Sequence, residues 1–349
     1  MGKSPKKPHT SLVLHEVTNQ KKRSVWWKRM APVIMLFFLA PLFGEYLLGN
    51  LKFSELMNLP FLALLYGTGA ILIREVTRKA GLGYASMLIL GVAYALIEEG
   101  LVDQMLFNPT YFTGQEKLMN TIIPVLGVDV WLSLIVVAMH AIWSTCLPII
   151  LVEAIFYKRG IKPWLGSSGL AMTVLIFAFG ALWLTHVIYL ESGFLASSAQ
   201  LIGTGIVVVA IIAATLMRKP RAVLLLPGFV PNPWILGGVA FAASSLYMLT
   251  EYLPGWTKVG ACLLISSLFF TLVFRWSHRG TWSNLHTLAL AGGGLLTYAW
   301  LGAVMEPETG PKATIDHIGT IVFIGGAVWL FITAVKNYQN LLSDKPVYT

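Results

Sequence analysis

The sequence predicts an all-α fold, a bundle of transmembrane helices that crosses the bilayer about ten times. Of its 349 residues, 56% are hydrophobic and only 12% are charged, and the mean hydropathy is +0.72. A soluble domain carries about a quarter charged residues. Apolar segments of near 20 residues recur along the chain, and basic residues gather between alternate segments. Together these observations exclude a soluble globular protein.

Ten apolar segments are each close to the roughly 20 residues that cross about 30 Å of hydrocarbon. They are expected at about 31–49, 58–73, 82–99, 128–156, 168–189, 199–217, 233–251, 257–274, 285–303 and 314–335. The fourth is long enough to tilt, and Pro148 is expected to kink it.

The basic residues predict that both termini are cytoplasmic. With the N-terminus inside, the cytoplasmic segments hold Lys21, Lys22, Arg23, Lys28, Arg29, Arg74, Arg78, Lys79, Lys158, Arg159, Lys162, Arg218, Lys219, Arg221, Arg275, Arg279, Lys336 and Lys345. The opposite side keeps only Lys52, Lys117, Lys258 and Lys312. Every loop then agrees with the positive-inside rule.

Three regions follow from this pattern: a basic cytoplasmic tail at 1–30 that is expected to be disordered, a transmembrane domain at 31–335, and a cytoplasmic tail at 336–349. The net charge of +9 is spread over the tail and loops, where it favours anionic lipid headgroups and not nucleic acid. We expect the chain in the cytoplasmic (plasma) membrane of a bacterium. Cys146 and Cys262 lie inside apolar segments, which indicates buried small side chains and no disulfide framework.

The third segment ends in two adjacent acids, Glu98 and Glu99. One carboxylate at bilayer depth costs about 2.5–3.5 kcal/mol on insertion scales, and two neighbours cannot both ionise easily. Such a pair requires a partner nearby. Counted at about 1.5 Å per residue, His140 in the fourth span and His186 in the fifth reach a similar depth in the outer half of the membrane. Tyr94 lies one turn before Glu98, and Trp143 and Ser144 share the helix face of His140.

Each of these residues also has a structural interpretation. Either histidine could be a buried neutral imidazole bonded to a carbonyl or hydroxyl group, and Glu98 and Glu99 could cap the helix at the interface. Glu45 and Glu153 are further acids within spans, and Glu153 is expected to extend to the cytoplasmic surface. We expect one shared polar site, because the four residues are predicted at one level.

The chemistry of such a site is acid–base chemistry on water. A carboxylate in a partly dry pocket can take a proton from water and return it to a leaving amine, while imidazoles orient the water and donate to an oxyanion. Two His and one Glu could also bind zinc, but the HExxH spacing and other local ligand patterns are absent from the sequence. No metal or cofactor is therefore expected.

The segment AYALIEEGL, ending in Glu98-Glu99 and Gly100-Leu101, resembles the first motif of the CAAX-protease and bacteriocin-processing (CPBP) intramembrane proteases. The resemblance covers about residues 81–190. It implies that Glu98 or Glu99 is the base, that VVAMH, ending in His140, is the second motif, and that His186 belongs to the third. Three positions differ from the family pattern: Asp103 replaces Arg, Val136 replaces Phe, and Leu190 replaces Asn or Asp.

Three functions remain open from the sequence. The first is a glutamate-type membrane peptidase or hydrolase, whose peptide or small-molecule substrate enters from the outer side past the loop at 100–127. The second is a transporter in which the same residues relay protons or bind a cation. The third is a non-catalytic scaffold subunit that binds a membrane protein partner through glycine-rich helix faces, as at Gly292 to Gly294.

Overall fold

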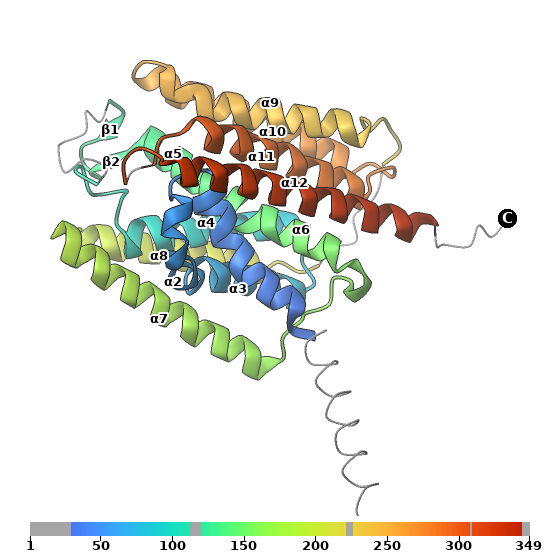
Figure 1. Cartoon of the computed structure of the whole chain (residues 1–349), viewed down its shortest axis with the longest axis horizontal. Coiled ribbons are helices and arrows are strands. Elements are labelled where there is room, and N and C mark those ends of the chain that lie inside the picture. Colours follow the sequence, from blue (N-terminus) through green and yellow to red (C-terminus); the bar gives the residue numbers. More distant parts are fainter. Residues whose placement is uncertain (1–28, 112–119, 221–225, 308, 344–349) are drawn as a thin grey trace, which may run out of the picture.

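The computed structural model describes residues 29–111, 120–220, 226–307 and 309–343 (Figure 1). The basic N-terminal tail expected at 1–30 lies almost entirely outside the described residues, as does the end of the C-terminal tail. Part of the expected entry loop, 112–119, is also outside them.

The described chain is built almost wholly from helices. In chain order the elements are the helix Arg29–Leu47 with its π-helical end η1 (Leu42–Leu47), η2 (Phe53–Asn58), α2 (Leu59–Ala63), α3 (Tyr66–Lys79), α4 (Tyr84–Ile97), η3 (Glu98–Val102), β1 (Ile122–Ile123), β2 (Val128–Asp129), α5 (Val130–Ala138), η4 (Met139–Cys146), α6 (Leu147–Ile155), η5 (Tyr157–Arg159), α7 (Ser167–Ser192), α8 (Ser198–Leu216), α9 (Pro233–Met248), η6 (Leu249–Tyr252), α10 (Trp256–Ser277), α11 (Asn284–Val304) and α12 (Thr314–Ser343).

The helices confirm the predicted all-α transmembrane bundle. Within the described ranges, nine helices are long and apolar enough to cross a membrane. A tenth crossing is present if Phe53–Ala63 and Tyr66–Lys79, which are bent by 45° at the break between them, form one span. That bent pair covers the expected span at 58–73. The last helix, α12, continues past the expected end at 335 to Ser343, and the location of the termini stays a prediction.

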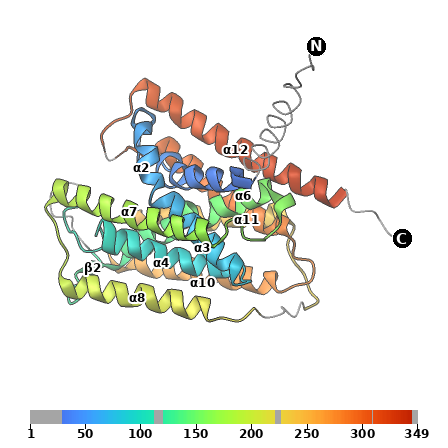
Figure 2. The ribbon, with the colours of Figure 1, turned by 90° about the horizontal axis from the view of Figure 1, so that it is seen from below.

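The helices divide into a central and a peripheral set. In Figure 1, α9 to α12 lie along one side of the molecule and α7 along the other, with α2, α3, α4 and α6 between them. Figure 2 places α8 on the side opposite α12. The apolar windows of α4, α5–α6 and α11 are each 61% buried, whereas those of α7, α8 and α10 are each 11% buried. The peripheral helices therefore present most of their surface to the surroundings of the bundle.

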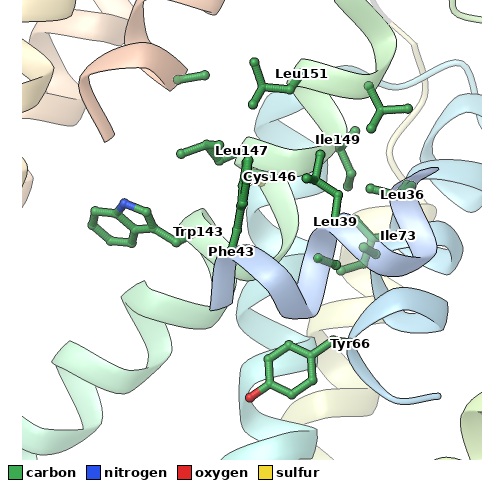
Figure 3. Close-up of a cluster of buried hydrophobic side chains, with 14 of the residues drawn as sticks. Leu36, Leu39, Phe43, Tyr66, Ile73, Trp143, Cys146, Leu147, Ile149 and Leu151 are labelled. Carbon is green, nitrogen blue, oxygen red and sulfur yellow. The ribbon is translucent and has the colours of Figure 1, made fainter. Parts of the chain in front are cut away.

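The main hydrophobic core joins the first helix, α3, η4, α6 and α11. Leu36, Ile149 and Leu151 are fully buried in it (Figure 3). Glycines allow the helices to approach closely: a Cβ atom on Gly293 of α11 would lie 2.3 Å from the carbonyl oxygen of Gly237 on α9. The core thus holds the central helices in fixed register around the polar residues described below.

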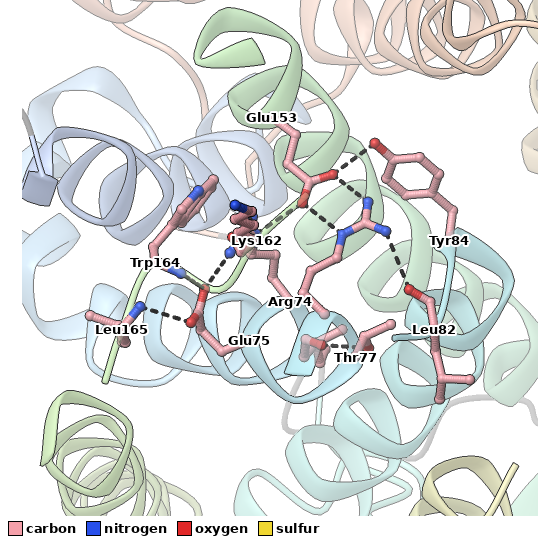
Figure 4. Close-up of polar contacts among 11 residues, drawn as sticks. Arg74, Glu75, Thr77, Leu82, Tyr84, Glu153, Lys162, Trp164 and Leu165 are labelled. Carbon is pink, nitrogen blue, oxygen red and sulfur yellow. Dashed lines mark hydrogen bonds and ion pairs between the residues drawn. The ribbon is translucent and has the colours of Figure 1, made fainter. Parts of the chain in front are cut away.

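A buried ionic network closes one end of the bundle, and it corrects two expectations (Figure 4). Glu153 does not extend to the surface: it is buried and accepts hydrogen bonds from Arg74 Nε at 2.9 Å and Arg78 Nη2 at 2.5 Å. Arg74 and Arg78 belong to the end of α3 and are not loop residues. Tyr84 donates to the same carboxylate at 2.7 Å.

Glu75 completes this network on the side of the α6–α7 connection. Its carboxylate accepts the backbone N–H groups of Trp164 and Leu165 at 3.0 and 2.9 Å and pairs with Arg74. The Arg74 guanidinium also lies over the Trp164 ring, 3.5 Å from its centroid. All four charges are thus paired, which is the condition under which buried ions persist.

Candidate functional site

The polar residues inside the bundle lie on three π-helical turns. Glu45 lies on η1, Glu98 and Glu99 on η3, and His140 on η4. η4 interrupts a span between α5 and α6, whereas η1 and η3 form the last turns of the first span and of the α4 span. A π-helical turn inserts one residue into the helical repeat and changes the direction of the side chains near it; such turns occur frequently at functional sites. The presence of three such turns in one cluster indicates a functional site.

His140 lies between the two glutamates. Its Nδ1 atom is 3.0 Å from Glu98 Oε2, and its Nε2 atom is 2.5 Å from Glu99 Oε1. All three side chains are buried. Because Glu98 and Glu99 are consecutive on η3 and still reach opposite sides of one imidazole, both adjacent acids point inward. The sequence left open which of the two faces the site.

These contacts determine how many protons the three side chains share. A neutral imidazole has one donor and one acceptor nitrogen, whereas a charged one has two donors. Either an imidazolium faces two carboxylates, or a neutral imidazole faces one carboxylate and one protonated carboxyl group. Both arrangements hold the same number of protons and a net charge of −1. A proton can therefore pass between His140 and a glutamate without any change in the total charge of the group.

Two tyrosines and a third glutamate enclose this group. The ring centroids of Tyr66 and Tyr94 lie 5.7 and 6.4 Å from that of His140. The Tyr66 hydroxyl donates a hydrogen bond to Glu45, and the amide of Asn50 donates to the other oxygen of Glu45 at 3.3 Å. The break between α2 and α3 immediately precedes Tyr66. The cluster thus combines groups from the first helix, α3, α4, η3 and η4.

Asp103 extends the acidic cluster just beyond the end of the span that carries η3. Its carboxylate accepts the N–H group of Met105 at 3.1 Å. Burial, followed by the charges of Glu99 and Glu98, holds the pKa of Asp103 well above its usual range. A raised pKa favours the neutral form of this acid, so Asp103 adds little to the negative charge of the cluster.

Four buried polar atoms near these helices have no hydrogen-bond partner among the described residues: Oε2 of Glu98, Oε2 of Glu99 and the hydroxyl oxygens of Tyr94 and Tyr298. Of these, Glu98 Oε2 is in ion-pair contact with His140. Leaving such an atom unpaired costs about 1–3 kcal/mol. Such atoms call for an explanation, and a bound water or substrate is the usual one. The Tyr298 ring stacks on Trp143, three residues after His140, with centroids 4.7 Å apart.

The structure does not bring His186 to this cluster. Its side chain is exposed on α7, one of the least buried helices of the bundle. Of the four residues expected to share a site, Glu98, Glu99 and His140 are in contact and His186 is not. Ser144 lies near the imidazole as its helix position predicts, with Oγ 3.4 Å from His140 Nδ1.

Three other residues of the cluster were not among the expected site residues. Glu45 was noted only as an acid within a span, and Tyr66 and Tyr298 were not singled out. For Glu45 the signal is the same as for Glu98, a carboxylate inside an apolar segment. The tyrosines carry no such signal, because a tyrosine in an apolar helix is ordinary. Within the described ranges, no group of three or more His, Cys, Asp or Glu residues has the arrangement of a metal site.

The comparisons with known proteins agree with the transmembrane fold. No curated protein and no solved structure matches the chain significantly. Residues 34–342 match the model of a family that carries the description "Uncharacterized membrane protein family". This match spans most of the chain and includes every residue of the cluster. The protein is therefore a multi-pass membrane protein and belongs to this family.

Proposed function

We propose that this protein is a membrane-embedded hydrolase in which Glu99 and His140 activate water. The observation that carries the proposal is the contact of one buried imidazole with two carboxylates, at 3.0 and 2.5 Å. A group that shares a mobile proton can accept one from water and later donate it to a leaving group. Glu99 is the better candidate base, because its Oε2 atom has no partner among the described residues.

The reaction would proceed in two steps. Glu99 Oε2 takes a proton from water while the water oxygen bonds to the substrate carbonyl carbon. The bond from that carbon to nitrogen then breaks, and the amine leaves with the proton that Glu99 held. Glu98 keeps the imidazole of His140 oriented toward Glu99. The hydroxyl group of Tyr94, buried within the cluster, is the candidate donor to the developing oxyanion.

Peptides are the proposed substrate class, and the support for this is the resemblance to the CPBP proteases. The first two motifs of that resemblance, at Glu98-Glu99 and at His140, fall on neighbouring elements that are in direct contact. The third does not join them, since His186 is exposed. Gln104 to Tyr111 pack at the end of η3, where Gln104 accepts the N–H group of Ala196 at 2.7 Å. This segment is the proposed control on entry.

The test compares the membrane proteins of cells that carry the wild-type chain with those of cells that carry Glu99→Gln. N-terminal peptide profiling is the readout, since it needs no known substrate. We expect a set of cleavage products that is present with the wild type and absent with Glu99→Gln. Glu191→Gln is the matched control, because Glu191 is exposed at the end of α7. The proposal fails if Glu99→Gln, present at wild-type levels in the membrane, yields the wild-type peptides.

A proton-coupled transporter is the second candidate, and Glu45 is the observation that favours it. Glu45 and Tyr66 extend the ionisable groups from η3 and η4 to the first helix, and the helix pair that carries Tyr66 is bent by 45°. Buried acids and discontinuous helices are common in transporters. Purified protein in vesicles with a pH-sensitive dye tests this function. Proton flux that Glu45→Gln abolishes would favour the transporter over the hydrolase.

A further inference from the structure

A cavity of about 500 Å³ lies between the two halves of the bundle. Its wall comes from α4, the end of α5, η4 and α6 on one side and from α9, α10 and α11 on the other. The cavity reaches η4 at Trp143. Glu98, Glu99 and His140 are not among the described residues that line it, so it is separate from the proposed reaction site. Its volume is in the range of ligand pockets, about 300–1,000 Å³.

The wall of this cavity is chemically apolar. Most lining side chains are hydrocarbon, and most of the polar ones already bind protein atoms. The donors and their acceptors are Trp143 Nε1 to Gly294 O, Ser244 Oγ to Ala240 O, Tyr247 OH to Leu134 O, Tyr84 OH to Glu153 Oε2, and Ser277 Oγ to Phe274 O. A polar guest would lose its hydrogen bonds to water and gain few in return. The wall therefore selects an apolar guest.

The dimensions of the cavity match half of a bilayer. Along α10 the lining residues run from Ile265 to Ser277, about 18 Å at about 1.5 Å per residue. One leaflet is roughly half of the ~30 Å hydrocarbon thickness. Phe270 and Phe274 line the cavity and are also 42% and 65% exposed, so the cavity opens sideways at these residues. A chain that belongs to a membrane lipid can enter there without crossing water.

One end of the cavity has the character of a headgroup region. Trp282 and Ser277 line it there. Arg275 is at the same level of α10 but does not line the cavity: it is exposed on the opposite face of the helix, the face that carries Leu264 and Leu268. Tryptophan and arginine at this level are typical of contacts with lipid headgroups, and basic residues favour anionic ones. We infer that the cavity binds one acyl chain of an anionic phospholipid, whose headgroup lies at the Arg275 end.

The test uses the full-length protein in phosphatidylcholine vesicles that contain a small fraction of phosphatidylglycerol with a photoreactive acyl chain. Ile265 and Phe269 lie one turn apart on α10 and line the cavity, whereas Leu264 and Leu268 are exposed beside them. We expect saturable labelling of Ile265 and Phe269, and labelling without saturation at Leu264 and Leu268. Equal, non-saturating labelling at all four positions would mean that only bulk lipid is present and would overturn the inference.

Two pairs of measurements make the outcome specific. Ala243→Trp fills the cavity from α9, and Ala242→Trp places the same side chain on the exposed face of that helix. We expect the first to weaken saturable labelling about tenfold, equivalent to about 1.4 kcal/mol, and the second to leave it unchanged. Unlabelled phosphatidylglycerol should compete better than phosphatidylcholine.

Either an unaffected Ala243→Trp variant or equal competition by the two lipids would contradict the inference. The same labelling in Glu99→Gln protein separates this result from the fate of the proposed hydrolase, because lipid binding does not depend on the reaction.

Discussion

At the scale of single residues, His140 is bound on both sides, which limits what each neighbour can do. Its two ring nitrogens contact Glu98 and Glu99, so the imidazole cannot bind a water directly through either nitrogen in this arrangement. In the proposed hydrolysis, water must therefore approach a carboxylate oxygen. Oε2 of Glu98 and Oε2 of Glu99 both have no hydrogen-bond partner among the described residues, but Oε2 of Glu98 is already 3.0 Å from His140 Nδ1. His140 then acts on water only through the proton that it shares with the glutamates.

The structure and the family resemblance lead to different predictions for a variant of His186. His186 is exposed on α7, so we expect His186→Ala to give the same cleavage products as the wild-type chain. The resemblance assigns His186 to the third motif of the proteases and implies that the variant is inactive. Peptide profiling beside Glu99→Gln decides between them. A loss as complete as that of Glu99→Gln would assign His186 to the site and require α7 to turn inward.

The buried ionic network gives a prediction on stability. Arg78→Ala would leave Glu153 with one fewer charge partner in a buried position, and breaking a buried ion pair typically costs about 3–5 kcal/mol. Thermal unfolding in detergent measures the loss. The matched control is Arg218→Ala, an exposed arginine beyond the end of α8, for which we expect a change within about 0.5 kcal/mol. Equal unfolding temperatures for the two variants would contradict the structural importance of the network.

At the scale of elements, the sequence predicted the helices well and their irregular turns not at all. The apolar runs placed the nine long helices, because burial in lipid requires the same side chains wherever the helix lies, and the expected span at 58–73 corresponds to the bent pair. The turns η1, η3 and η4 each depend on one extra residue in the helical repeat, which hydropathy does not register. Glu153 was misjudged for a related reason: the expected span at 58–73 ended before Arg74 and Arg78, which are its partners.

The packing of α3 against α4 depends on Gly69. A Cβ atom at this position would lie 2.3 Å from Cε2 of Tyr94, so Gly69→Ala must displace the tyrosine ring or separate the two helices. Overpacking of this kind costs about 1–3 kcal/mol. We expect lower thermal stability and, because Tyr94 encloses His140, lower activity in the peptide profile. Gly205→Ala on α8 is the control, since a Cβ atom there meets open space. A stable and fully active Gly69→Ala variant would contradict this packing.

At the scale of the whole molecule, the last spans form part of a cavity wall, a role that the sequence did not indicate. The site lies among the first helix, α3, η3 and η4, while α9 and α10 are peripheral. With α11, these helices supply one wall of the lipid cavity, and α11 also contributes Tyr298 beside Trp143. The first five spans and the last five are therefore not equivalent halves. The first half holds the ionisable residues, and the second packs on it and encloses an apolar space.

The distribution of exposed basic residues predicts the orientation of the bundle in the membrane. Arg74 and Arg78 are paired internally and no longer count as loop charges. The same end of the bundle still carries Lys158, Arg159, Lys162, Arg218, Lys219, Arg275 and Arg279. At the other end, Lys312 donates to the carbonyl groups of Gly302 and Met305. The positive-inside rule thus still places the end with Arg218 in the cytoplasm.

The native cysteines make this orientation simple to measure, because Cys146 and Cys262 are both buried. A membrane-impermeant maleimide should label Ser192→Cys, at the exposed end of α7, in intact cells. It should label Arg218→Cys, beyond the end of α8, only after the membrane is opened. The unmodified chain is the control and should remain unlabelled in both cases. The reverse pattern would invert the bundle, and peptides would then have to reach Glu99 from the cytoplasmic side.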